Sequence, residues 1–192
     1  MTEAVINNLP ELLRKHLCTL KKASMDTTNR QAMCDSQIMV VNFDKIPNEY
    51  ASGRGWSGVP KSNDALYIDT KNKWFFVEFK NGAVKKDEIY RKMYDSLIML
   101  VELNFIPNLD FARNNINYIL VYNEEKTSKC PPSESRDITY GYFGKLAQTE
   151  KRLFDIDKFE KYLFQETHTY TKELFQEKFI DLKEKEECVN KK

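Results

Sequence analysis

The chain is poor in the residues that build several common kinds of site. It has only two histidines, His16 and His168, and four cysteines that stand far apart with no CxxC pair. Zinc sites and dithiol centres need clusters of such residues. The sequence therefore predicts isolated, reduced thiols, and it favours neither zinc chemistry nor a histidine-based catalytic triad.

Long hydrophobic runs and an excess of one charge are also missing. No segment approaches the roughly 18 apolar residues of a membrane span, and 30 basic residues stand against 29 acidic ones. The first residues lack the basic, apolar and small-residue segments of a signal peptide. We therefore expect a cytoplasmic protein without membrane contact, in which only a local basic patch could bind a polyanion.

The apolar content is high enough for a folded core. Of the 192 residues, 41% are hydrophobic and 12% are aromatic, which suits one domain. Helical spacing predicts helices over 3–23 and 84–105, and β-rich runs predict strands over 38–43 and 117–122 and a hairpin over 64–80. This order favours an α/β domain with a mixed sheet flanked by helices.

The remaining segments are expected to be loops and a helical tail. Residues 24–36 and 47–63 have no regular pattern, and a last short strand is expected near 140–143. Charged, helically spaced residues predict a helical C-terminal extension over 145–192, packed on the domain formed by residues 1–144.

The hairpin over 64–80 carries the most informative pattern. Its turn suits a three-residue loop opened by Asp69 and closed by Asn72, which tolerates the left-handed conformation. In that register Asp64 lies across from Glu78, and Lys80 shares their face because side chains alternate along a strand. Two carboxylates and an ammonium are thus predicted at one end of an otherwise apolar hairpin.

This grouping predicts a particular chemistry. Neighbouring carboxylates repel one another unless a cation lies between them, and oxygen ligands favour Mg²⁺ or Mn²⁺. An ammonium beside such an ion can orient a water and stabilise charge at phosphorus. Asp64, Glu78 and Lys80 are therefore candidate catalytic residues for phosphodiester hydrolysis. The alternative is that Glu78 and Lys80 merely mark the frayed end of a strand, with salt-bridging to Asp64.

The motif Asn63-Asp64 followed by Glu78-Phe79-Lys80 resembles the PD-(D/E)xK nuclease superfamily, although Asn63 replaces a frequent proline. The resemblance implies a restriction-endonuclease-like αβββαβ core and a Mg²⁺- or Mn²⁺-dependent hydrolase. It implies metal ligation by Asp64, Glu78 and the backbone carbonyl of Phe79. Glu11 is a further candidate ligand, because the family often adds a carboxylate from its first helix.

The expected substrate is nucleic acid, with DNA preferred over RNA. Basic residues near the motif in sequence are candidate phosphate contacts: Arg54, Lys61, Lys85, Lys86, Arg91 and Lys92. Homodimerisation is left open. The rival function is a catalytically inactive nuclease-like fold that binds protein or nucleic acid, which the near-neutral charge mildly favours.

Overall fold

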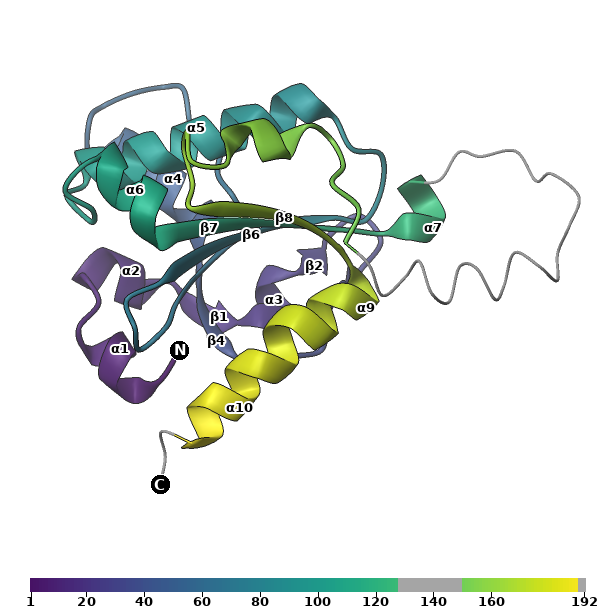
Figure 1. Cartoon of the computed structure of the whole chain (residues 1–192). Helices are drawn as coiled ribbons and strands as arrows, with labels where there is room; N and C mark the ends of the chain where they lie inside the picture. The colour runs from purple at the N-terminus through teal and green to yellow at the C-terminus, as the bar shows by residue number, and fades with distance from the viewer. Residues whose placement is uncertain (128–149, 190–192) are drawn as a thin grey trace, which may run out of the picture.

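The computed structural model describes residues 1–127 and 150–189, and its centre is a mixed six-stranded sheet (Figure 1). In spatial order its strands are β1 (Leu17–Thr19), β4 (Met39–Asn42), β5 (Ala65–Ile68), β6 (Trp74–Lys80), β7 (Ile116–Tyr122) and β8 (Glu166–Thr171). The pairs from β1 to β6 are antiparallel, whereas β6, β7 and β8 run parallel to one another.

Helices cover both faces of the sheet (Figure 1). On one face lie α4 (Ile46–Ser52), α5 (Lys86–Glu102) and α6 (Leu109–Asn115). On the other lie α9 (Lys172–Phe175), the π-helical turn η3 (Gln176–Ile180) and α10 (Asp181–Val189), together with α1 (Glu3–Asn7), α2 (Glu11–Lys15) and α3 (Leu20–Ala23). Smaller elements are the hairpin β2 (Met25–Asp26) and β3 (Gln31–Ala32), the 3-10 turns η1 (Phe43–Lys45) and η2 (Ile156–Phe159), and α7 (Glu124–Thr127). The predicted α/β class with helices on both faces is confirmed.

Apolar side chains from both layers explain why this arrangement is stable. α5 buries Ile89, Met93, Leu97 and Leu100 at helical spacing. On the other face, aromatic rings of β5 and β6 pack on Phe179, whose ring centroid lies 5.6 Å from that of Tyr67. Each such side chain, when fully buried, stabilises the fold by about 1.5–3 kcal/mol.

The predicted hairpin register is confirmed. Ala65 pairs with Val77 and Ile68 with Trp74, so each pair of residue numbers sums to 142 and the next pair outward is Asp64 with Glu78. The turn closes at Asn72, whose φ of 58° lies in the left-handed region. Asparagine tolerates that conformation, which is why the turn could be predicted.

The predicted helix over 3–23 is wrong as a single element. Pro10 has no N–H to donate and disfavours helical backbone in the residue before it, so α1 ends at Asn7 and α2 starts at Glu11. Residues 17–19 then leave the helical path because they pair with β4 as strand β1. The apolar residues of this segment are spaced as in one helix but belong to three short elements.

Two further predictions need correction. Helix α4 starts at Ile46 and takes up the first residues of the expected loop over 47–63, because Pro47 stands at its start, where a missing N–H costs nothing. Strand β8 lies within the expected helical extension. Its threonines at 167, 169 and 171 are buried and strongly favour a strand, although the segment is polar. α9 and α10 confirm the helical part of that prediction, and the strand expected near 140–143 lies outside the described residues.

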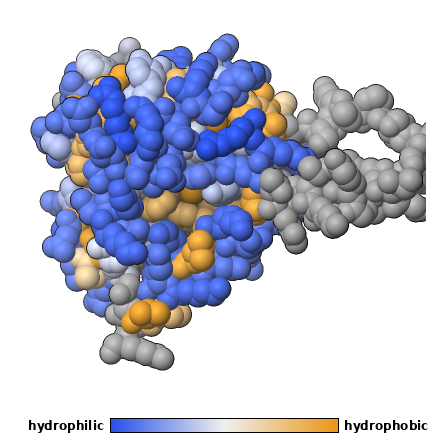
Figure 2. Space-filling view, viewed as in Figure 1, coloured by the Kyte–Doolittle hydropathy of each residue, from blue (hydrophilic) through white to orange (hydrophobic). Residues whose placement is uncertain are grey.

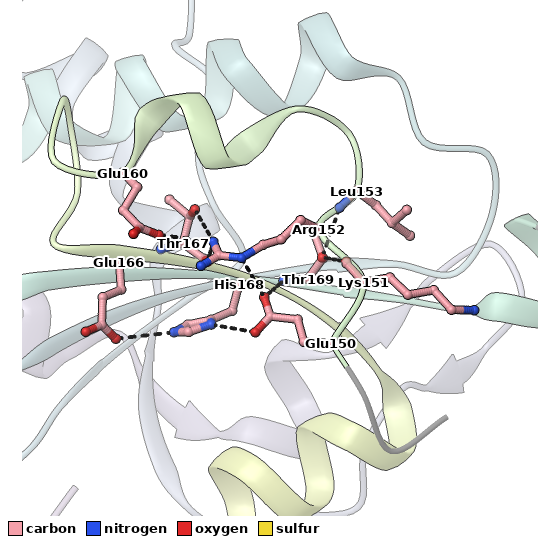
Figure 3. A network of polar contacts seen from close by, with 9 residues as sticks. All are labelled: Glu150, Lys151, Arg152, Leu153, Glu160, Glu166, Thr167, His168 and Thr169. Carbon is pink, nitrogen blue, oxygen red and sulfur yellow. Dashed lines mark hydrogen bonds and ion pairs between the residues drawn. The ribbon is translucent and has the colours of Figure 1, made fainter. Parts of the chain in front are cut away.

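The outer edge of β8 is covered by the segment that precedes η2 (Figure 3). Glu150 accepts a hydrogen bond from the backbone N–H of Thr169 at 3.0 Å and contacts His168 Nδ1 at 3.0 Å. Arg152 donates to the carbonyl of Thr167. These contacts satisfy backbone groups of an edge strand that could otherwise pair with another chain.

The surface on the face shown in Figure 2 is mostly hydrophilic, with apolar residues in separated patches. Among the described residues, no helix has the length and apolar character needed to cross a membrane. Cys18, Cys34 and Cys188 are free thiols, and Cys130 lies outside the described part of the chain.

Candidate functional site

Asp64 and Glu78 meet at one end of the β5–β6 hairpin. Asp64 immediately precedes β5 and Glu78 lies near the end of β6, so the hairpin register sets them opposite one another. Asp64 Oδ2 accepts a hydrogen bond of 2.7 Å from the backbone N–H of Phe79. That bond fixes the Asp64 carboxylate against the last residues of β6.

Lys92 of α5 places its ammonium between the two carboxylates. Its Nζ lies 3.0 Å from Asp64 Oδ1 and 2.7 Å and 2.9 Å from the two oxygens of Glu78. The Glu78 side chain is fully buried and that of Lys92 is only 17% exposed. Burying this carboxylate without a cation would be costly, so Lys92 stabilises the pair in the structure.

Lys80 completes the group that the sequence predicted. Its Nζ lies 2.9 Å from Glu78 Oε1 and its side chain is 19% exposed. Asp64, Lys80 and Lys92 all line a pocket of about 310 Å³, together with Asp44, whose carboxylate accepts a hydrogen bond of 2.8 Å from Ser62. The charged groups therefore face a space that a ligand can enter.

The electrostatics of the pair follow from burial and from mutual repulsion. Burial, and then the neighbouring charge of Glu78, raise the pKa of Asp64 to about 7, even though Lys92 and the Phe79 N–H lower it. For Lys92, burial lowers the pKa, but the charges of Glu78 and Asp64 outweigh it and hold the pKa above its ordinary value. Lys92 is therefore charged at neutral pH while Asp64 is close to titrating.

We expect this raised pKa to make the stability of the fold depend on pH. The folded form holds the Asp64 proton more tightly than the unfolded chain, in which the pKa of this carboxyl has its ordinary value of 3.8. The stabilisation that protonated Asp64 contributes to the fold is therefore complete below about pH 4. It is lost as the pH rises through about 7. Urea unfolding of the wild type and of Asp64→Asn from pH 4 to 8 should show the wild type losing stability relative to the variant. A difference that does not vary with pH would contradict this.

Two buried polar groups close to the pair have no hydrogen-bond partner among the described residues. They are the side-chain amide of Asn63 and the hydroxyl of Tyr118. Burial, followed by the charges of Glu78 and Asp64, holds the pKa of Tyr118 well above its ordinary value, so the hydroxyl stays neutral. An unsatisfied buried group of this kind costs about 1–3 kcal/mol, and functional sites are where such a cost is commonly found.

The oxygen ligands at this place suit a hard divalent cation. In the described part of the chain no three His, Cys, Asp or Glu side chains gather as metal ligands. Asp64 and Glu78 are the paired carboxylates, and Asp44 is a further carboxylate that lines the pocket. Mg²⁺ is commonly held by one or two carboxylates and completes its shell with water or phosphate oxygens. The Phe79 carbonyl points to the β5 side of β6, as its N–H does. A cation at this place would have to displace the Lys92 ammonium.

Some of the other predicted phosphate contacts lie beside the candidate site, and others lie away from it. Lys85, Lys86 and Arg91 lie near the start of α5, the end that also carries Lys92, and all are exposed. Lys86 pairs with Asp155 and Arg91 with Asp95. Lys85 pairs with Glu88, so all three flank the candidate site but already have an acidic partner.

Arg54, Lys61 and Glu11 are not brought into the cluster. Arg54 pairs with Glu102 at the far end of α5 and stacks on Tyr50, about 15 Å along the helix from Lys92. Lys61 contributes a backbone N–H to Asp95. Glu11 is exposed and follows Pro10, which lines a different pocket at the turn end of the hairpin.

The sequence missed two parts of the site. The first is the contact of Lys92 with the carboxylates: Lys92 was predicted as a phosphate contact, whereas it lies at the edge of the buried face and pairs with Asp64 and Glu78. It stands four residues before the buried Ser96, which accepts from the Asn63 N–H. That spacing was a usable signal. The second part is the hairpin β2–β3, whose neighbourhood contributes Met25, Asp26 and Met33 to the pocket and had no visible pattern.

Comparison of the chain with protein-family models, with curated proteins and with solved structures found no match.

Proposed function

We propose that this chain is a metal-dependent nuclease of the PD-(D/E)xK kind, which hydrolyses phosphodiester bonds of DNA in preference to RNA. The observation that carries the proposal is the convergence of Asp64, Glu78 and Lys80 at the end of one hairpin, beside an open pocket. Two buried carboxylates in an apolar sheet are costly, which makes a purely structural role a poor explanation of the cluster.

The order of elements also supports the restriction-endonuclease-like topology. Three antiparallel strands, β4, β5 and β6, are followed by the long helix α5 and then by β7, which pairs parallel to β6. Short helices precede them. With β1, α4 and α6 as additional elements, this order is compatible with αβββαβ; Asp64 immediately precedes the second of the three strands and Glu78 lies on the third.

Each residue would have a distinct task. Asp64, Glu78 and the Phe79 carbonyl would hold Mg²⁺ or Mn²⁺, which when bound polarises a phosphoryl oxygen and lowers the pKa of a water. The Lys80 ammonium would orient the attacking water and stabilise negative charge at phosphorus. Lys92, once separated from the carboxylates, has the length and charge to contact a neighbouring phosphate.

The direct test is cleavage of supercoiled plasmid and of single-stranded circular DNA. We expect cutting in the presence of Mn²⁺ or Mg²⁺ and none when a chelator is present. Absence of cutting on both substrates at every metal concentration tested would overturn the nuclease proposal.

One observation favours the rival function, a catalytically inactive nuclease-like fold that binds protein or nucleic acid. The Lys92 ammonium already bridges both carboxylates through three short contacts, and Lys80 adds a second positive charge beside Glu78, so the two acids have cationic partners without a metal. A binding module of this kind would not take up Mn²⁺ at Asp64 and Glu78. Metal titration therefore separates the two functions.

A further inference from the structure

The pocket beside the acidic pair is lined by two chemically different kinds of side chain. Asp26, Asp44, Asp64, Lys80 and Lys92 are charged, whereas Met25 and Met33, from the β2–β3 region, are apolar. Met33 is buried and Met25 is 41% exposed. Methionine side chains adapt to flat or irregular apolar groups. The pocket thus pairs a place for a phosphate with a place for a base.

The β2–β3 hairpin is fastened over the end of β6. Asp26 Oδ2 accepts a hydrogen bond of 2.8 Å from the side-chain amide of Asn81, which directly follows Lys80. Asn81 in turn accepts a hydrogen bond of 2.8 Å from the Asn123 amide. Asp26 also accepts from the backbone N–H groups of Thr28 and Asn29, which shapes the hairpin turn. We call this set of contacts the Asp26–Asn81 latch.

The latched hairpin limits which molecules can reach Asp64, Lys80 and Lys92. About 310 Å³ lies at the lower end of the range for pockets that enclose one small molecule, roughly 300–1,000 Å³. The basic residues outside the pocket, Lys85, Lys86 and Arg91, all lie on α5. They line one side of the site, which suits the backbone of one strand better than the two backbones of a duplex.

We propose that the pocket receives one unpaired nucleotide, so that the chain acts on single-stranded nucleic acid and on single-stranded flaps in preference to continuous duplex. This inference rests on the proposed nuclease function and specifies its substrate. The base lies against Met25 and Met33 while its phosphate meets Lys80. A nucleotide inside a duplex would first have to leave its stack and its pairing partner, which costs a few kcal/mol.

The test compares one fluorescein-labelled oligonucleotide in three forms: alone, annealed to its full complement, and annealed to a shorter complement that leaves a flap. With Mn²⁺ present, we expect the single strand and the flap to be cut about 10- to 100-fold faster than the blunt duplex. Cuts in the flapped form should lie within the unpaired part. Equal cutting of the blunt duplex, abolished by Glu78→Gln, would overturn this inference and leave the nuclease proposal intact.

If none of the three forms is cut, a binding measurement tests the preference for single strands instead. Fluorescence anisotropy with Ca²⁺ in place of Mn²⁺ measures the affinity for each form. Preferential binding of the single strand without any cutting would support the pocket inference and refute the nuclease proposal. Equal or tighter binding of the duplex would overturn the pocket inference.

The latch gives a matched pair of variants. Asp26→Ala and Asn81→Ala each break the latch, and we expect either to narrow the ratio of single-strand to duplex cutting by about fivefold or more. Asp35→Ala is the control, because Asp35 is 86% exposed, pairs with Lys21 and does not line the pocket. An unchanged ratio in both latch variants, with thermal unfolding showing that they are folded, would refute the role given to the hairpin.

Discussion

Replacing Glu78 with glutamine should remove nuclease activity, lowering the cleavage rate by at least about a thousandfold. Glutamine keeps the shape of the side chain but not the charge. The Glu78 carboxylate is fully buried and contacts both Lys80 and Lys92, so the substitution removes its charge from the centre of the cluster. The rate is measured on single-stranded DNA with Mn²⁺.

The same substitution should also lower stability, but by a smaller and separable amount. Two ammonium groups lose a charged partner, which we expect to cost about 1–3 kcal/mol in the free energy of unfolding. Glu88→Gln is the matched control, because Glu88 is 54% exposed and pairs with Lys85 on the surface of α5. Full activity in folded Glu78→Gln would show that Glu78 has no catalytic role.

Replacing Lys92 with methionine should produce the largest loss of stability. The ammonium lies within 3.0 Å of both carboxylates. Its removal takes away the cation that bridges Asp64 and Glu78 and leaves Lys80, which contacts Glu78, as the neighbouring positive charge. Breaking a buried pair in this way costs about 3–5 kcal/mol. The loss should be greatest above pH 7, where Asp64 is ionised, and smaller near pH 5, where protonation relieves the repulsion.

A divalent cation should reverse that loss. With the ammonium gone, Mn²⁺ no longer competes with Lys92, and a concentration of about 100 times the Kd restores about 2.7 kcal/mol. Urea unfolding with and without Mn²⁺ measures both effects. Lys85→Met is the control, at a position 74% exposed; it should neither lose stability on substitution nor gain stability from Mn²⁺. A Lys92→Met protein that is destabilised but gains nothing from Mn²⁺ would favour the binding-module function.

The parts of the fold that the sequence predicts well are those in which one local rule decides. The hairpin register follows from a turn that ends at Asn72, and that register alone placed Asp64 opposite Glu78. α5 follows from its apolar spacing. Both depend on residues near one another in the chain, so no distant partner could override them.

The parts that could not be predicted depend on contacts between distant segments. Residues 17–19 become a strand only because β4 lies beside them, and β8 becomes one because β7 offers a parallel partner. The Asp26–Asn81 latch joins residues 55 positions apart. In each case the local pattern favours another structure or none, and tertiary pairing decides.

Lys92 is an intermediate case. It was predicted as a phosphate contact because it lies near the motif in sequence, but its direct contact with Glu78, 14 residues earlier, was not predicted. Helical spacing with Ile89 and Ser96 places it at the boundary of the buried face, where a long side chain can reach a carboxylate. The structure thus adds a competitor for the metal that the three-residue motif did not contain.

The central claim, that Asp64 and Glu78 form a metal site, is tested most directly by isothermal titration of the purified protein with Mn²⁺, beside Asp64→Ala and Glu78→Ala. We predict heat of binding for the wild type and its loss in both variants, each of which should be shown to be folded. A wild type that binds no Mn²⁺, or variants that bind it as tightly as the wild type, would contradict the claim.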